Sequence, residues 1–184
     1  ILSALGDDLP GAVTVSRIGD PISVSADDAL RSGDSTSFSK DSRIRASIAG
    51  NVLKFSMKSR DQRLTLPGSG EYGDRIVKLS PPGEYDALVH NEFYVMSLAK
   101  ACGIEVPDFD VVHRENVEIA PSDWATAEEH AFSIARFDRS DQGRVHMEDF
   151  CQAGNLPGFQ RSKYQSSVEY VMKVAYRNYD LPSL

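Results

Sequence analysis

One long helical pattern stands among short segments in which apolar and polar residues alternate. Apolar side chains recur at helical spacing over residues 86–102, where Val89 and Phe93 share one ridge. Asp86 can act near the start of this helix, and Gly103 is placed to end it. The sequence therefore predicts a single early helix inserted among strands.

The strand patterns supply the rest of the expected core. Residues 51–57 alternate as in a half-buried strand, with Phe55 and Met57 facing one way. Lys54 and Ser56 face the other way. The other expected strands cover residues 63–66, 74–79, 107–112, 117–120 and 131–137, the first as hairpin partner of 51–57 and the third and fourth as a second hairpin. The predicted fold class is α+β, a mostly antiparallel five-stranded sheet with one inserted helix and a helical C-terminal segment.

Composition divides the chain into zones. Residues 1–18 are a short apolar piece, and residues 19–42 are rich in Ser, Asp and Gly, which predicts a flexible linker. Residues 43–139 hold the strand and helix patterns, and residues 140–184 are mainly helical. The start at Ile1, without Met, suggests a piece of a longer chain.

Charge and residue counts exclude several classes. The formal net charge of −7 gives no bulk attraction to nucleic acid. The sequence contains no run of about 18 apolar residues that would predict a membrane span. It also shows no secretory signal, so we expect a cytoplasmic location. Cys102 and Cys151 are expected as reduced thiols without a CxxC motif, and the four histidines are scattered without HExxH spacing, so no metal site is predicted.

Three features in chain order favour nucleotide binding. Small residues over 45–51, with Gly50, allow backbone N–H groups to approach phosphate oxygens. Lys78 lies on an expected strand and Glu92 on the expected helix, and a lysine that meets phosphates needs a carboxylate to hold it. Taken singly, the glycine is an ordinary turn, and the Lys and Glu are solvated surface groups. In this order, the three together predict a phosphate-binding site.

Several blocks of the sequence carry a resemblance to a known family: residues 47–57, 76–78, 91–92, 135–139 and 144–152. Together they resemble the HipA family, whose members are bacterial toxin kinases of toxin–antitoxin and persistence systems. The most specific are R-F-D-R at 136–139 and H-M-E-D-F-C-Q at 146–152. L-G-D-D-L-P-G-A at 5–12 is similar to the end of the small N-terminal subdomain of that family. The resemblance implies a protein-kinase-like small lobe over 43–139, followed by a connector and the first helices of the large lobe.

The resemblance also implies residue roles. ATP would be contacted by the loop, by the Lys–Glu pair and by the strand end that forms the hinge, at Ile48, Ala49, Gly50, Lys78, Glu92, Ala135 and Phe137. Ser47 matches a loop serine that family members autophosphorylate, although a turn serine bonding its own backbone is the ordinary interpretation. Ala135 departs from the polar residue that many relatives carry there.

The implied activity is that of a Ser/Thr protein kinase whose phosphorylation of a protein target arrests growth. Family targets include aminoacyl-tRNA synthetases, and the usual partner is a DNA-binding antitoxin of the HipB type. The catalytic Asp and Asn and the Mg²⁺ ligands are expected beyond residue 184, so no catalytic residue is assigned and the chain alone is expected to be inactive. Two alternatives stay open: a non-catalytic module that binds an antitoxin or a partner kinase, and a nucleotide sensor.

Three other segments allow more than one interpretation. Residues 138–144, rich in Asp and Arg, are either functional or a solvated turn with local ion pairs. The basic hairpin tip at 58–63 either meets an antitoxin, a substrate or DNA, or is a solvated face. Residues 146–150 are expected to open a helix, with Met147 and Phe150 in the core.

Overall fold

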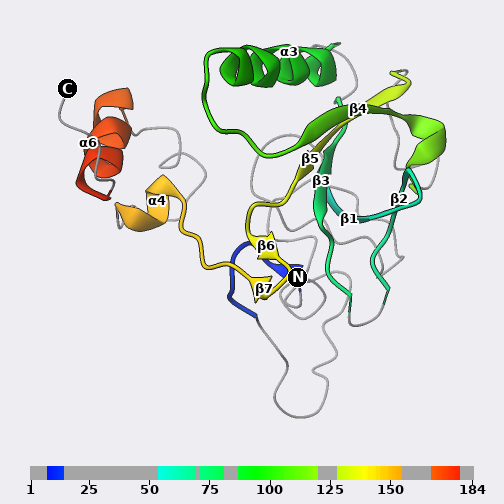
Figure 1. Cartoon of the computed structure of the whole chain (residues 1–184), viewed down its shortest axis with the longest axis horizontal. Helices are drawn as coiled ribbons and strands as arrows, with labels where there is room; N and C mark the ends of the chain where they lie inside the picture. Colours follow the sequence, from blue (N-terminus) through cyan, green and yellow to red (C-terminus); the bar gives the residue numbers. More distant parts are fainter. Residues whose placement is uncertain are drawn as a thin grey trace, which may run out of the picture.

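The sheet is the centre of the molecule. The structure is a computed structural model that describes residues 8–14, 54–68, 71–80, 87–119, 128–154 and 167–178. Its five strands lie in the order β2-β1-β3-β5-β4, and every neighbouring pair is antiparallel. One long helix, α3, follows β3 and precedes β4 (Figure 1). The predicted α+β class is confirmed.

The elements have the following bounds. The strands of the sheet are β1 (Lys54–Arg60), β2 (Arg63–Thr65), β3 (Arg75–Lys78), β4 (Phe109–His113) and β5 (His130–Ala135). A small hairpin follows, of β6 (Arg139–Ser140) and β7 (Gly143–Arg144). The described helices are α3 (Leu88–Ala101), the 3₁₀ turn η2 (Arg114–Asn116), α4 (Phe150–Ala153) and α6 (Val168–Asn178). Figure 1 shows α4 and α6 beyond the small hairpin, away from the sheet.

A two-residue turn fixes the first hairpin. Asp61 and Gln62 both have positive φ, of 45° and 67°, which matches the right-handed twist of the strands on either side. Arg60 faces Arg63 in the register, so the strands pair directly from the turn. The predicted hairpin is present, but its bounds need correction, because residues 63–65 pair with Lys58–Arg60 at the end of β1. Lys54–Met57 pair with β3 instead.

The second predicted hairpin, of 107–112 with 117–120, is wrong. Strand β4 pairs with β5 over its whole length instead. Val117 makes a parallel bridge to Leu64, and the N–H of Glu118 donates to the Leu64 carbonyl at 2.8 Å. The physical reason is burial: Val117, 5% exposed, packs into the apolar cluster beneath β1 and β2, which a local hairpin would not allow.

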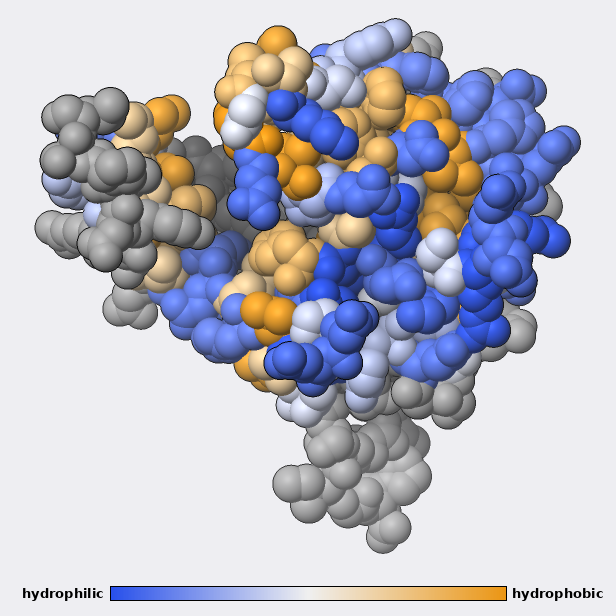
Figure 2. All heavy atoms as spheres, in the orientation of Figure 1, coloured by the Kyte–Doolittle hydropathy of each residue, from blue (hydrophilic) through white to orange (hydrophobic). Residues whose placement is uncertain are grey.

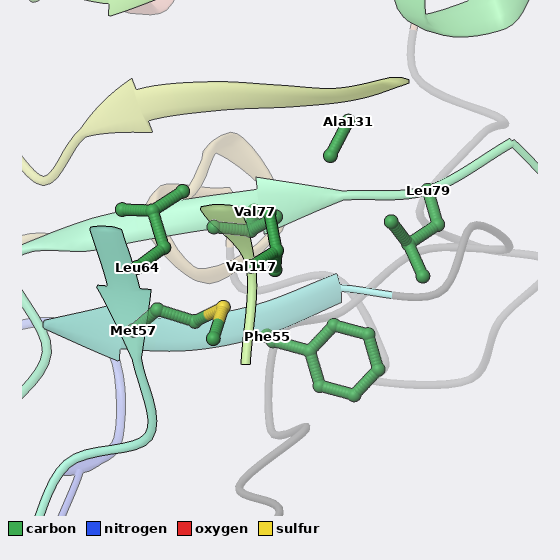
Figure 3. Packing of buried hydrophobic residues seen from close by; sticks show 7 residues of the cluster. All are labelled: Phe55, Met57, Leu64, Val77, Leu79, Val117 and Ala131. Carbon is green, nitrogen blue, oxygen red and sulfur yellow. The ribbon is translucent and has the colours of Figure 1, made fainter. Parts of the chain in front are cut away.

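The apolar cluster lies on one face of the sheet (Figure 3). Its members are buried side chains from four strands, from the residue after β3 and from the turn at Val117: Phe55, Met57, Leu64, Val77, Leu79, Val117 and Ala131. The opposite face meets α3, where Val89 is 2% exposed. There the ring of Phe109 lies 5.6 Å from Phe93 and 6.1 Å from Phe132, so aromatic contacts join the helix to β4 and β5.

Two local expectations need correction. Ser56 was expected on a solvated face but is 1% exposed, because Arg136 Nη1 donates to its Oγ at 2.8 Å. Helix α4 begins only at Phe150, since the Asp149 side chain caps the N–H of Gln152 in a capping box. Phe150 is 43% exposed and is not a core residue.

The end of α3 was predicted correctly. Gly103 has φ +80°, and the N–H of Ile104 donates to the Ala99 carbonyl at 3.0 Å, which ends the helix in a left-handed turn. Asp86 and the expected linker at 19–42 lie outside the described residues.

Candidate functional site

An ion pair joins the central strand to the helix. Lys78 Nζ lies 2.5 Å from Glu92 Oε2, and each side chain is 25% exposed. Lys78 ends β3, and Glu92 sits in the second turn of α3. The pair predicted from the sequence is therefore present.

The surroundings of Lys78 hold the pair in place. Phe132 is the direct partner of Lys78 across β3 and β5, and the ammonium lies 5.5 Å from the centre of its ring. Val89, buried one turn before Glu92, fixes the start of the helix against the sheet. A partly exposed ion pair contributes only about 0.2–1 kcal/mol to stability. Stability alone therefore does not explain why the lysine is placed here.

A second lysine stands opposite the first. Lys54 is the register partner of Lys78 across β1 and β3, so both side chains leave the same face of the sheet. Like charges directly opposite on paired strands are unfavourable, and the Glu92 carboxylate beside Lys78 offsets this repulsion. The two-residue alternation placed Lys54 on the polar face, but only the register brings it to Lys78.

The loop that the resemblance assigns to phosphates falls outside the described part of the chain. Ser47, Ile48, Ala49 and Gly50 lie before the first described residue of β1. Their contacts and the autophosphorylation of Ser47 therefore stay predictions.

The strand end that the resemblance assigns to adenine already uses its amides. The N–H of Ala135 donates to the Asp108 carbonyl at 2.7 Å, and the N–H of Arg136 donates to the Asp74 carbonyl at 2.9 Å. The Phe137 side chain is 63% exposed. Adenine would therefore have to bind to carbonyl groups or to Phe137, and this contact stays a prediction.

A buried group of charges follows this strand end, which we call the Arg136 cluster: Asp8, Arg136, Asp138 and Arg139. Arg136 Nη1 lies 2.9 Å from Asp8 Oδ1, and Arg136 Nη2 lies 2.8 Å from Asp138 Oδ2. Arg139 reaches the same two carboxylates at 2.8 Å. Every one of these side chains is less than 10% exposed, so the solvated turn considered for 138–144 is wrong at its start.

The cluster balances two guanidinium groups against two carboxylates. Burial raises the pKa of Asp138, but hydrogen bonds from Arg136 and from the Gly11 N–H, with the charges of Arg136 and Arg139, outweigh it and hold that pKa below its usual value. The Gly11 N–H donates to Asp138 Oδ2 at 2.7 Å. The charged residues of the R-F-D-R block are thus buried together with Asp8. The sequence did not reveal this, because Asp8 is more than 120 positions away.

The basic hairpin tip is largely neutralised. Lys58 lies 2.8 Å from Asp74, and Arg60 pairs with Glu71. A hydrogen bond from the Gly68 N–H, together with Arg60 and Lys58, lowers the pKa of Glu71 against a smaller effect of burial. The structure therefore supports an ion-paired, solvated face here.

Three of the histidines come together, although their spacing suggested scatter. The His130 ring lies 5.4 Å from His90 and 5.5 Å from His113, at steep angles. His90 Nδ1 contacts Glu128 Oε1 at 3.1 Å, and the Ser80 hydroxyl donates to the same carboxylate. Sequence spacing missed this group because its members come from α3, β4 and β5. Within the described ranges, no group of three or more His, Cys, Asp or Glu side chains is arranged to hold a metal ion. No described helix is long and apolar enough to cross a membrane.

Comparison with known proteins decides the family. The family model of the HipA-like C-terminal domain matches residues 46–181. The chain belongs to the HipA family. This confirms the resemblance, and it places the sheet, α3, α4 and α6 inside the matched region, whereas the segment at 8–14 precedes it.

Two curated relatives of this HipA-family chain come from Sinorhizobium fredii. The putative kinase Y4dM is 37% identical over 156 residues, which cover 83% of this chain and 36% of the relative. The putative kinase Y4mE is 33% identical over 129 residues, which cover 67% of this chain and 27% of the relative. The chain thus spans about a third of the length of these relatives.

A solved HipA structure has the same fold. It is the HipA of Shewanella oneidensis MR-1 in a complex with HipB and operator DNA. The match has a TM-score of 0.56 at 22% sequence identity, and it covers 92% of this chain and 40% of that chain. At this identity the match supports the fold of the HipA-family chain and not its residue roles.

Proposed function

We propose that this chain is the ATP-binding part of a HipA-like Ser/Thr protein kinase toxin. The observation that carries the proposal is the Lys78–Glu92 ion pair between β3 and α3. A carboxylate that holds a lysine in one orientation leaves the remaining ammonium protons available to phosphate oxygens. Phosphoryl transfer depends largely on such positioning and charge, so a preformed pair suits it.

The charges around the pair fit a triphosphate. Lys54 brings a second cation to the same face of the sheet as Lys78, and their positive charges would attract the phosphate groups of ATP. Mg²⁺ would enter with ATP and neutralise part of the developing charge. The described residues supply no group suited to a metal, so its protein ligands are proposed to lie in other parts of the kinase.

The cellular role follows the family. The kinase would phosphorylate a serine or threonine of a protein target, proposed to be an aminoacyl-tRNA synthetase, and so arrest growth. A HipB-type DNA-binding antitoxin is proposed as partner, supported by the HipA–HipB–operator complex of the solved relative. Phosphorylation of Ser47 would add about −1.5 to −2 charges next to the proposed phosphate site and would oppose ATP binding.

The test compares two lysines of the same sheet. Lys78→Ala removes the proposed phosphate contact, whereas Lys58→Ala removes a lysine that is paired with Asp74 at the hairpin. In NMR titrations of the 184-residue chain with Mg·ATP, we expect the first variant to bind at least about tenfold more weakly, which corresponds to about 1.4 kcal/mol. The second variant should bind like the original chain.

A longer protein that includes the remainder of the kinase provides the activity test. There, Lys78→Ala should abolish phosphotransfer and Lys58→Ala should leave it intact. Equal ATP affinities for the two variants would contradict the assigned role of Lys78. An original chain that does not bind ATP at all would favour the alternative, a module that binds an antitoxin or a partner kinase.

A further inference from the structure

The segment at residues 8–14 is bound to the connector between β5 and α4. Figure 1 shows it beside the small β6–β7 hairpin. Its Asp8 Oδ1 accepts hydrogen bonds from Arg136 Nη1 at 2.9 Å and from Arg139 Nη2 at 2.8 Å. Its backbone is held as well, since Arg139 Nη2 donates to the Leu9 carbonyl at 3.0 Å and Arg144 Nη1 to the same carbonyl at 3.3 Å. Side chains of the connector thus grip a segment that lies far away in sequence.

The fit around this segment is close. The Asp8 side chain is fully buried, and Gly11 has φ +72°. A Cβ added at Gly11 would lie 3.1 Å from Met147 Cγ and 3.2 Å from the Met147 backbone nitrogen. Glycine is therefore required here twice, by its left-handed backbone and by the close approach of Met147.

The same segment also touches the sheet. Asp8 Oδ2 receives the N–H of Gly73, which precedes β3, at 3.3 Å. Arg136, which Asp8 holds, reaches the Ser56 hydroxyl of β1 at 2.8 Å. The segment therefore lies where the sheet and the connector meet, with contacts to both.

We propose that residues 8–14 act as a strap, in which Asp8 is a positioning residue that fixes the connector against the sheet through Arg136. The connector carries Phe137, whose neighbours on both sides are buried in the Arg136 cluster while its own ring is 63% exposed. Release of the strap changes the position of Phe137 relative to Lys78 and weakens nucleotide binding. The nucleotide part of this inference rests on the function proposed above, whereas the mechanical part does not.

Charge makes this strap sensitive to a single change. Apolar packing would tolerate a small shift, but a guanidinium that loses its carboxylate must find another anion or reach water. Asp8→Asn leaves two arginines to share Asp138, so the connector is expected to move or to take up water. Changing Arg139 to Gln in the same chain restores one Arg to one Asp and should return the connector toward its original position.

Hydrogen exchange tests the strap in the full 184-residue chain. The reporters are the connector amides of Arg139 and Val145, which donate to the Arg136 and Asp138 carbonyls. In Asp8→Asn we expect these amides to exchange at least about tenfold faster, while those of Phe55 and Val77 change less. The double variant Asp8→Asn/Arg139→Gln should recover most of the protection.

Leu64→Ala is the matched control. Leu64 is buried in the apolar cluster on β2, so its loss destabilises the sheet without touching the connector. In this variant, exchange of the connector amides should accelerate no more than exchange of the sheet amides. Its Mg·ATP affinity under folding conditions should equal that of the original chain. In Asp8→Asn the affinity should fall by about fivefold or more.

The outcomes separate the two proposals. The strap would be overturned if Asp8→Asn accelerated exchange of the connector amides no more than it accelerated exchange of the β1 and β3 amides. A loosened connector with unchanged Mg·ATP affinity would overturn its link to nucleotide binding. If the original chain binds no ATP, the proposed function fails, and the exchange data still decide whether the strap exists.

Discussion

Asp138→Asn removes one charge from the Arg136 cluster and keeps the size of the side chain. In the original chain Asp138 accepts from the Gly11 N–H at 2.7 Å, from Arg136 Nη2 at 2.8 Å and from Arg139 Nη1 at 2.8 Å. An asparagine has one acceptor oxygen and presents an NH₂ group to the other donors. The variant therefore leaves two buried guanidinium groups to share the single carboxylate of Asp8.

The expected cost is large. The side chains of Asp138 and Arg136 are 4% and 1% exposed, so water does not compensate for the lost charge. Removing one partner of such a buried pair costs about 3–5 kcal/mol. Domains of ordinary stability have about 5–15 kcal/mol in total, so the variant should fold with a markedly lower denaturation midpoint.

Urea denaturation followed by circular dichroism measures this difference. The matched control is Glu115→Gln, because Glu115 is 84% exposed and lies 3.7 Å from His113. An exposed pair of this kind contributes about 0–1 kcal/mol, so this control should hardly change the midpoint.

The pH dependence gives an independent check. The folded pKa of Asp138 lies below its ordinary value of 3.8, so the ionised form stabilises the fold at neutral pH. That contribution is complete above the unfolded pKa and is lost as the pH falls through the folded pKa. The stability gap between the original chain and Asp138→Asn should therefore shrink below about pH 4. A gap under about 1 kcal/mol at neutral pH, or one that stays constant into acid, would refute the reasoning.

Three further predictions concern single positions. In urea denaturation, Gly73→Ala should lower stability by about 3 kcal/mol, because its Cβ would lie 2.8 Å from the β1 backbone. Gly103→Ala should lower stability by only about 1–2 kcal/mol. The cost there is the strain of its left-handed backbone, since no atom lies within 4 Å of the added Cβ. Ser133→Ala should be neutral or stabilising in urea denaturation, because the buried Ser133 hydroxyl has no hydrogen-bond partner among the described residues; a loss of stability would contradict this. The Glu71 carboxyl should titrate below its usual range in carbon-detected NMR. High salt should reverse this shift only in part, since the Gly68 N–H bond is not screened as the charge of Arg60 is.

The ion pair was accessible from sequence because both of its positions follow local patterns. Lys78 ends a short apolar strand bounded by Gly73 and Pro81, and Glu92 lies on the long helix, so the packing of that helix on the sheet brings them together. Each element could be recognised within its own window of residues. The family blocks then supplied an interpretation of the pair that spacing alone does not give.

The Arg136 cluster was not accessible in the same way. Its arginines and Asp138 were visible as a polar block, which by composition is typical of a solvated turn. Their burial depends on Asp8, which no local window connects with them. The histidine group and the bridge from Val117 to Leu64 were missed for the same reason, because each depends on contacts between distant elements.

The ion pair and the Arg136 cluster depend on one register. Strands β3 and β5 pair Lys78 with Phe132 at one end and Arg75 with Ala135 at the other. A slip by one residue would turn Lys78 to the opposite face, away from Glu92, and would shift Arg136 relative to Ser56 and Asp8. Arg136 N–H donates to the Asp74 carbonyl, so the cluster itself holds the last pair of the register in place. The register that buries Arg136 and Asp138 is therefore the same register that directs Lys78 toward Glu92 on α3, and this connects the two most distinctive features of the molecule.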